Sequence, residues 1–334
     1  MSWALLMLAC AVVAFTTWAA TWAVLRALVR LEVYDTPNSR SSHVQPKPRG
    51  GGLALLPVLF VAWCGAVLWL DAAPPGFWLV LLGAGLLIVV SCLDDLRNLP
   101  AGLRLLVQTA AVALGLAGMD GSGLVFQGLL PPLVDHIAAA VLWLWFVNLF
   151  NFMDGIDGIA GVEAMSLALG LVLVGGLARW DAPMLAHPAL LAAATLGFLV
   201  WNWAPAKLFL GDVGSVPLGY LLGWLLLLAA MEGQWAAALI LPLYYLSDAT
   251  VTIVKRGIRR AKIWQAHKEH FYQRAVQGGW SHARVATGVL ICNVLLIGCA
   301  AMAALGYTWP ALGIATLVVI IFLFLLERMA RLAP

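Results

Sequence analysis

Aspartate and asparagine gather in a few short stretches of an otherwise apolar chain. The densest stretch reads Asn148-Leu-Phe-Asn151-Phe-Met-Asp154-Gly-Ile-Asp157-Gly, in which two amides and two carboxylates are spaced by three residues. On a helical turn this spacing places the four side chains on one face. Hard oxygen ligands of this kind suit Mg²⁺ and a polar substrate, and a glycine after each aspartate lets a ligand approach the backbone. A purely structural role at a helix end is the alternative.

A pair of adjacent carboxylates, Asp94 and Asp95, precedes Arg97 and Arg104. Neighbouring carboxylates repel each other, which raises the pKa of one of them toward the range of a general base. A divalent cation, or a phosphate that arrives with Mg²⁺, would relieve this repulsion. The competing interpretation is that both carboxylates solvate the end of a helix.

A third polar stretch follows Asn202 and reads Lys207-Leu-Phe-Leu-Gly-Asp212-Val-Gly-Ser215. Asp212 could cap a helix that begins there, because Asp and Ser are favoured at helix N-termini. An aspartate between two glycines, close to Phe209, would also serve as a metal ligand beside a platform for a stacked base.

A glycine-rich basic stretch occupies residues 46–52 and reads Pro-Lys-Pro-Arg-Gly-Gly-Gly. The glycine N–H groups, together with Lys47 and Arg49, could bind a phosphate. A turn anchored by positive charges is the alternative, and the spacing is not that of a nucleotide P-loop.

A second basic stretch runs from Lys255 to Arg274. Its cations are most simply an anchor on anionic lipid. His267 and His270 could bind a metal, but no Cys accompanies them, so we expect them to contact a phosphate instead.

The elements that position these stretches must be membrane helices. Of the 334 residues 63% are hydrophobic and 10% charged, and the mean hydropathy of +0.96 excludes an ordinary soluble domain. A spanning helix needs about 20 apolar residues. The sequence therefore predicts an all-α, polytopic fold of about eleven spans in a single domain, 1–334. The expected spans are 3–25, 51–70, 77–93, 103–118, 136–150, 161–178, 186–203, 214–231, 234–252, 283–304 and 309–326.

The positive charges indicate how the spans are oriented. The first span has no positive residue before it, and Arg26 and Arg30 follow it, which is the reverse of a cleavable signal peptide. With the N-terminus in the periplasm, only Arg179 of the 19 Lys and Arg falls on the outer side, and the C-terminus is cytoplasmic. We therefore expect one active site on the cytoplasmic face of a bacterial inner membrane, built from loops 26–50, 94–102, 151–160, 204–214 and 255–281.

In order and placement, four motifs resemble one family: the Asp94-Asp95 pair, the Asn-x-x-Asn-x-x-Asp-Gly-x-Asp-Gly run, the Phe-Leu-Gly-Asp-x-Gly-Ser loop and the late histidine loop. The family is that of the polyprenyl-phosphate N-acetylhexosamine-1-phosphate transferases, glycosyltransferase family 4. The resemblance covers the chain from Asp35 to Arg274 at least. It implies an enzyme that uses Mg²⁺, for which Mn²⁺ could substitute, to bind a UDP-N-acetyl sugar. The phosphate of undecaprenyl phosphate attacks the sugar-linked phosphorus, UMP leaves, and a lipid-diphosphate sugar forms.

The resemblance also implies roles for individual residues. Asp212 would be the Mg²⁺ ligand, and Asp94 or Asp95 would position or deprotonate the lipid phosphate. Phe209 would stack on the uracil. The remaining substrate-binding residues would be Asn151, Asp154, Asp157 and Asn202 around the nucleotide, and Lys47, His267 and His270 facing phosphates. These roles agree with the residue types, because phosphoryl transfer needs in-line positioning and neutralised oxygen charge.

The histidine loop departs from the pattern of many relatives. Gln265 stands where an aspartate often precedes a His-x-His-His run, and Glu269 occupies one histidine position. As a weaker resemblance, this departure points to the branch that initiates O-antigen synthesis in lipopolysaccharide, with UDP-GlcNAc, UDP-FucNAc or UDP-QuiNAc as the donor. The alternative is the peptidoglycan transferase that uses UDP-MurNAc-pentapeptide.

Two other classes of protein compete with this interpretation. A secondary transporter would carry carboxylates near the membrane midplane in broken, repeated helices, whereas here only Asp248 lies partly inside a span. An inactive scaffold would not be expected to keep the five aspartates 94, 95, 154, 157 and 212. Besides the two substrates we expect membrane lipid as a partner and no nucleic acid. The sequence leaves the oligomeric state open, a homodimer included.

Overall fold

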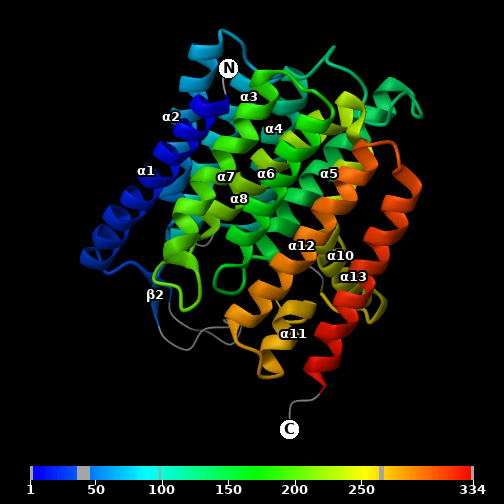
Figure 1. The fold of residues 1–334 in the computed structure, drawn as a ribbon. Coiled ribbons are helices and arrows are strands. Elements are labelled where there is room, and N and C mark those ends of the chain that lie inside the picture. Colours follow the sequence, from blue (N-terminus) through cyan, green and yellow to red (C-terminus); the bar gives the residue numbers. More distant parts are fainter. Residues whose placement is uncertain (1–2, 36–45, 98, 263–266, 332–334) are drawn as a thin grey trace.

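The computed structural model describes residues 3–35, 46–97, 99–262 and 267–331, so Gln265 and part of loop 26–50 lie outside the described residues. The described chain is a bundle of helices with one short antiparallel strand pair, which confirms the expected all-α fold (Figure 1). The elements are α1 Trp3–Arg30, β1 Tyr34–Asp35, β2 Lys47–Pro48, α2 Gly52–Leu70, α3 Phe77–Arg97, α4 Ala101–Gly118, α5 Pro132–Phe152, α6 Ile159–Leu177, α7 Ala182–Asn202, α8 Asp212–Ala229, the π-helical turn η1 Ala230–Gln234, α9 Trp235–Ile240, α10 Leu243–Ile258, α11 Phe271–Gln277, α12 His282–Ala304 and α13 Thr308–Ala330.

The membrane-spanning character of the bundle is also confirmed. Within the described residues, ten helical segments are long and apolar enough to cross a membrane. They match the expected spans except over 214–252, where the sequence predicts two spans. There the structure contains one candidate segment, Asp212–Ile240, and divides residues 234–252 between α9 and α10.

The chain reverses after α8 and returns as two short helices. Gly233, with a φ of 81°, breaks the helical path inside η1. Trp235 at the start of α9 contacts Trp309 at the start of α13. Pro242 separates α9 from α10, because a proline inside a helix lacks the N–H donor and clashes with the preceding turn. The predicted ninth span is therefore a broken helix, and neither piece is long enough to be a span by itself.

Helix α8 lies at the centre of the bundle. All its residues from Val213 to Ala229 are buried, and it contacts α2, α3, α5 and α6. Gly219 packs against Phe150 and Gly223 against Trp143, because small residues let membrane helices approach closely. This packing fixes the position of Asp212, the first residue of α8.

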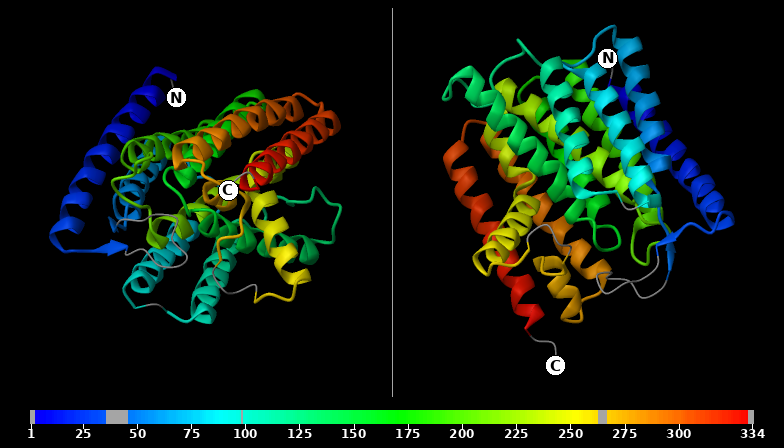
Figure 2. Two further views of the ribbon diagram at one scale, coloured as in Figure 1. Left: turned by 90° about the horizontal axis from the view of Figure 1, so that it is seen from below. Right: turned by 180° about the vertical axis from the view of Figure 1, so that it is seen from behind.

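The polar stretches gather at one end of the bundle, the lower end in Figure 1, which Figure 2 also shows from below. The helix α11, the ends of α3 and α5, and the starts of α2, α8 and α12 lie there. Helix α1 begins at the opposite end and α13 ends at the lower one, so the first and last described residues are on opposite sides of the bundle.

Candidate active site

The loops that precede α2 and α8 are joined by backbone hydrogen bonds. Phe209 O accepts hydrogen bonds from the Gly50 and Gly51 N–H groups at 3.1 and 2.8 Å, and Phe209 N–H donates to Pro48 O at 2.9 Å. Of the two interpretations of this stretch, the structure favours the turn over a phosphate-binding loop. The glycine N–H groups are occupied in holding the loop that leads to Asp212.

The first turns of α2 and α8 are in direct contact. Gly52 N–H donates to Leu210 O at 3.0 Å. A Cβ atom at residue 52 would lie 2.3 Å from the Gly214 Cα, so no larger residue fits there unless the backbone moves. Two helix N-termini thus lie together, and helix dipoles favour anionic groups at such ends.

Arg49 lies between two carboxylates at these helix ends. Its Nη2 is 3.0 Å from Asp95 Oδ1 and 2.6 Å from Asp212 Oδ1. Asn151 Nδ2 donates to the same oxygen of Asp212 at 3.1 Å and to Ser215 Oγ at 2.8 Å. Burial opposes the charged form of Arg49, but Asp212 and Asp95 outweigh it and raise the pKa of the guanidinium above its ordinary value.

The two adjacent aspartates of α3 have different environments. Asp94 accepts hydrogen bonds from Leu99 N–H at 2.7 Å and from Arg104 at 2.9 Å. Asp95 instead contacts Arg49 and lies 3.4 Å from Val213 N–H in the first turn of α8. Successive side chains on a helix point about 100° apart, so only one of the pair faces the site.

The expected common helical face of residues 148–157 is only partly formed. Helix α5 ends at Phe152, so Asp154 and Asp157 lie in the turn that follows it. Gly158, with a φ of 81°, adopts a left-handed conformation that a helix does not contain. On the helix itself, Asn148 bonds Gln108 on α4 at 2.9 Å, whereas Asn151 faces Asp212.

Asp154 is half-buried in this turn. Burial raises its pKa to about 7, the negative charge of Asp212 acts in the same direction, and Arg49 opposes both. Asp154 is therefore largely protonated below neutral pH.

Asp157 joins three segments of the chain. Its Oδ2 accepts hydrogen bonds from Ala206 N–H at 2.9 Å and from Lys47 at 3.3 Å, and His282 Nδ1 lies 3.3 Å from its Oδ1. Burial opposes the ionised form, but the contacts from His282 and Ala206 outweigh it and lower the pKa of Asp157 to about 2. Asp157 therefore organises the loops around the site.

Asn202 has a similar organising position behind the site. It accepts a hydrogen bond from Gly158 N–H at 3.1 Å and donates to Leu208 O at 3.0 Å. The half-buried ring of Phe209 has its centroid 5.3 Å from Lys47 Nζ, a cation–π contact at the edge of the same loops.

The late histidine segment is anchored to α10 by the buried Asp248. This carboxylate accepts hydrogen bonds from Phe271 and Tyr272 N–H at 3.0 and 3.2 Å, and His270 Nδ1 lies 3.3 Å from its Oδ1. His267 lies beside His270, with ring centroids 4.8 Å apart. Burial and the neighbouring His270 lower the pKa of His267 to about 4, so its imidazole is neutral at pH 7.

Tyr272 connects this segment to the turn that carries Asp154. Its hydroxyl donates to Phe152 O at 3.1 Å. A Cβ atom on Gly155 would lie 2.1 Å from that hydroxyl oxygen. This close approach is one reason for the glycine that follows Asp154.

The donor set fits Mg²⁺ only together with a substrate. Among the residues that the structure describes, no three His, Cys, Asp or Glu side chains form a ready-made metal cluster. Mg²⁺ is usually held by one or two carboxylates plus substrate phosphates rather than by an all-protein cage. Asp212 and Asp95, which share Arg49, are carboxylates of that kind.

Four of the residues selected from the sequence lie around one guanidinium. Asp95, Asn151, Asp154 and Asp212 surround Arg49, whereas Asp94 and Asn202 serve neighbouring backbone. The contacts of Arg49 with carboxylates, and the parts of Tyr272, Ser215 and His282, are absent from the sequence prediction. For Arg49 the available signal is a cation next to the glycines that open α2, and for Ser215 it is the place three residues after Asp212 in the same motif. Tyr272 and His282 are brought to the site by tertiary packing.

Several known proteins are similar to this chain over most of its length. Residues 77–230 match the model of glycosyl transferase family 4. A decaprenyl-phosphate N-acetylglucosaminephosphotransferase of Mycobacterium tuberculosis is 31% identical over 310 residues, which cover 81% of this chain and 76% of the relative. A probable undecaprenyl-phosphate N-acetylglucosaminyl 1-phosphate transferase of Bacillus subtilis is 29% identical, covering 78% and 74%. A phospho-N-acetylmuramoyl-pentapeptide-transferase of Rhodopseudomonas palustris is 30% identical, covering 76% and 79%. The chain thus belongs to glycosyl transferase family 4, as a polyprenyl-phosphate N-acetylhexosamine-1-phosphate transferase.

Proposed function

We propose that this protein transfers an N-acetylhexosamine 1-phosphate from a UDP-sugar to undecaprenyl phosphate. The lipid phosphate oxygen forms a bond to the sugar-linked phosphorus of the UDP-sugar, and the bond from that phosphorus to UMP breaks. The products are UMP and a lipid-diphosphate sugar. The names of the relatives support this type of transfer and its polyprenyl-phosphate acceptor.

The convergence of Arg49, Asp95 and Asp212 is the observation that carries the proposal. Asp95 of α3 and Asp212 of α8 each place a carboxylate oxygen within 3.0 Å of one guanidinium nitrogen of Arg49, which precedes α2. A diphosphate needs both positive charge and a metal ligand, and this arrangement supplies Arg49 for the first and Asp212 for the second. Such a site works by positioning and charge neutralisation, which phosphoryl transfer requires.

Asp212 and Asp95 are the residues that would hold Mg²⁺ with the diphosphate of the donor. When bound, Mg²⁺ would neutralise the oxygens around the attacked phosphorus. Arg49 then gives up its carboxylate contacts and binds phosphate oxygens. Of the two adjacent aspartates, Asp95 is the one that would position or deprotonate the lipid phosphate, because both oxygens of Asp94 are engaged elsewhere.

Direct attack by the lipid phosphate agrees best with this geometry. A covalent enzyme intermediate would need Asp95 as the nucleophile, whereas the proposal uses this carboxylate to hold Mg²⁺ and to position the lipid phosphate. Exchange of labelled UMP into the UDP-sugar in the absence of any lipid phosphate would contradict direct attack.

The choice of the O-antigen branch over the peptidoglycan enzyme rests on Glu269, which occupies a histidine position of many relatives. Its carboxylate pairs with Arg256 and with Arg259, so an acidic residue at this position is held by two cations of α10 and its C-terminal end. We propose UDP-GlcNAc, UDP-FucNAc or UDP-QuiNAc as the donor, on the cytoplasmic side of the inner membrane.

The test is UMP release by the purified protein with undecaprenyl phosphate, Mg²⁺ and a panel of UDP-N-acetyl sugars, with UDP-MurNAc-pentapeptide included. Asp212→Asn should abolish lipid-dependent release. Asp71→Asn is the matched control, because Asp71 ends α2 at the opposite end of the bundle in a left-handed conformation that asparagine tolerates. Absence of UMP release with every donor would refute the proposal, and release with UDP-MurNAc-pentapeptide alone would refute the choice of branch.

A further inference from the structure

A second polar pocket lies between α10 and α11. It encloses about 270 Å³ and is lined by Thr252, Lys255, Arg259, Lys268, Glu269, Phe271, Arg274 and Gln277. None of the carboxylates around Arg49 lines it. The transfer reaction described above therefore leaves this pocket without a role.

The pocket carries an excess of positive charge. Its one carboxylate, Glu269, is already paired with Arg259 and with Arg256, which lies outside the lining. Arg274 pairs with Glu327 of α13. Lys255 has its ammonium 4.5 Å from the centroid of the Phe271 ring, and within the described part of the chain no carboxylate contacts it. The lining thus retains cationic charge that the surrounding protein does not neutralise.

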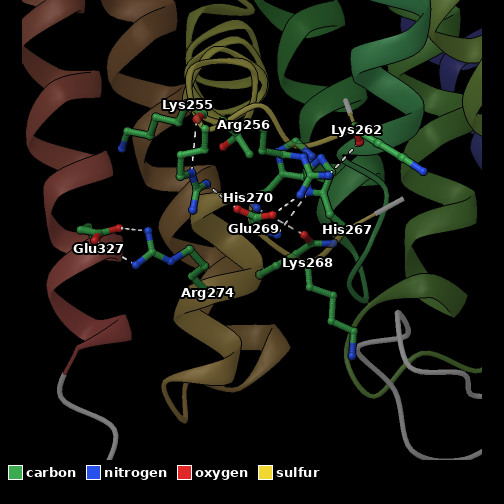
Figure 3. A network of polar contacts seen from close by, with 12 residues as sticks. Lys255, Arg256, Lys262, His267, Lys268, Glu269, His270, Arg274 and Glu327 are labelled. Carbon is green, nitrogen blue, oxygen red and sulfur yellow. Dashed lines mark hydrogen bonds and ion pairs between the residues drawn. The ribbon is translucent and has the colours of Figure 1, made fainter. Parts of the chain in front are cut away.

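The pocket lies beside an exposed apolar face of α10. On the adjoining face of α10, the side chains of Val251, Val254 and Ile258 are exposed, Ile258 by 78%. Exposed apolar side chains on a membrane-embedded bundle favour contact with acyl chains. Figure 3 shows Lys255 and Arg274 on the same side of Glu269, next to α13. A cationic pocket beside an acyl-chain surface matches a phospholipid, whose phosphate and tails lie at the same two levels.

We propose that this pocket binds the phosphate of an anionic phospholipid from the leaflet that borders the active-site end. The bound lipid would hold α11 against α10. That contact matters for catalysis because Phe271, which forms one wall of the pocket, donates its N–H to Asp248. The next residue, Tyr272, donates to Phe152 O beside the turn of Asp154. An empty pocket would leave this chain of contacts less ordered, so transfer should depend on the lipid.

Binding is measured first, without turnover. The full-length protein is exchanged into phosphatidylcholine nanodiscs with and without phosphatidylglycerol, and retained phospholipid is counted by native mass spectrometry. We expect wild type to retain phosphatidylglycerol in preference to phosphatidylcholine. A basic residue near an anionic surface contributes about 1 kcal/mol, so Lys255→Gln should weaken retention about five-fold and Lys255→Arg should preserve it. Lys262→Gln is the matched control, because Lys262 is exposed and lies outside the pocket lining.

The same nanodiscs then report on transfer. UMP release by wild type should rise with the phosphatidylglycerol fraction, and release by Lys255→Gln should not.

Equal retention of phosphatidylglycerol by wild type and Lys255→Gln would overturn the proposal, whether or not the protein transfers sugar phosphate. Displacement of the retained lipid by millimolar inorganic phosphate would assign the pocket to a free anion. Displacement by equimolar undecaprenyl phosphate would assign it to the lipid substrate. Either displacement overturns the phospholipid proposal.

Discussion

Arg49 and Asp212 are in contact across 163 positions of sequence, with Nη2 of the arginine 2.6 Å from Oδ1 of the aspartate. The same nitrogen lies 3.0 Å from Asp95. A single cation thus holds the carboxylates of α3 and α8 together. In this arrangement the guanidinium keeps the two carboxylates close by offsetting their mutual repulsion.

Replacing Arg49 should slow the transfer reaction. Arg49→Gln leaves the carboxylates of Asp95 and Asp212 without a cation, and we expect kcat/KM for UMP release to fall by roughly 10²-fold, the size of effect seen when one charged stabiliser of a transition state is lost. Arg49→Lys should recover only part of the activity, because an ammonium cannot reproduce the planar fork of the guanidinium. Arg97→Gln, at an exposed position at the end of α3, is the control. Unchanged kinetics in Arg49→Gln would exclude a role in phosphate binding.

Asp94 and Asp95 should respond differently to the same substitution. Asp95→Asn should reduce kcat strongly with little change in Tm, because Asp95 contacts site groups. Asp94→Asn should lower the free energy of unfolding by about 1 kcal/mol, since it loses the partly exposed pair with Arg104. It should keep most of the activity. Steady-state kinetics and thermal unfolding in the same detergent distinguish the two, and an inactive but stable Asp94→Asn would reverse the assignment.

The raised pKa of Asp154 predicts that the stability of the protein depends on pH. Its folded pKa of about 7 lies above the value of about 3.9 for an unfolded aspartate. Between these values the folded state binds more protons than the unfolded state, so this group makes stability fall as pH rises from about 4 to 7. Asp154→Asn should therefore raise Tm at pH 8 and change it little at pH 4. The measurement is thermal unfolding across that range without substrate. A Tm for Asp154→Asn below that of wild type at pH 8 would contradict the pKa shift.

Gly155 and Tyr272 should show coupling in a double-mutant cycle. Gly155→Ala places a methyl group 2.1 Å from the tyrosine hydroxyl, and such overpacking costs about 1–3 kcal/mol. Tyr272→Phe removes the atom in conflict and also the hydrogen bond to Phe152 O. The double variant should therefore be more stable than Gly155→Ala alone. Additive changes in Tm would show that the two residues do not touch.

The sequence predicts those features of the fold and the site that depend on residues close together in the chain. The approach of Asp212 to the start of a helix, and the all-α fold, follow from local composition and from the length of apolar runs. Which of Asp94 and Asp95 faces the site depends on how α3 is rotated against α8, which only packing determines. The reversal at Gly233 lies where the sequence prediction separates the spans 214–231 and 234–252. The break at Pro242 inside the second of these spans is absent from that prediction, although the proline is a visible signal.

The hydrogen bonds from the glycines before α2 to the loop before α8 have a consequence for biogenesis. Ribosomes synthesise the N-terminal part of a chain first, so α2 enters the bilayer while residues 209–214 have not yet been made. Until they arrive, the N–H groups of Gly50, Gly51 and Gly52 lack the carbonyls of Phe209 and Leu210. A nascent or truncated protein therefore has no assembled reaction centre, and substrates can be engaged only after the central helix has been inserted.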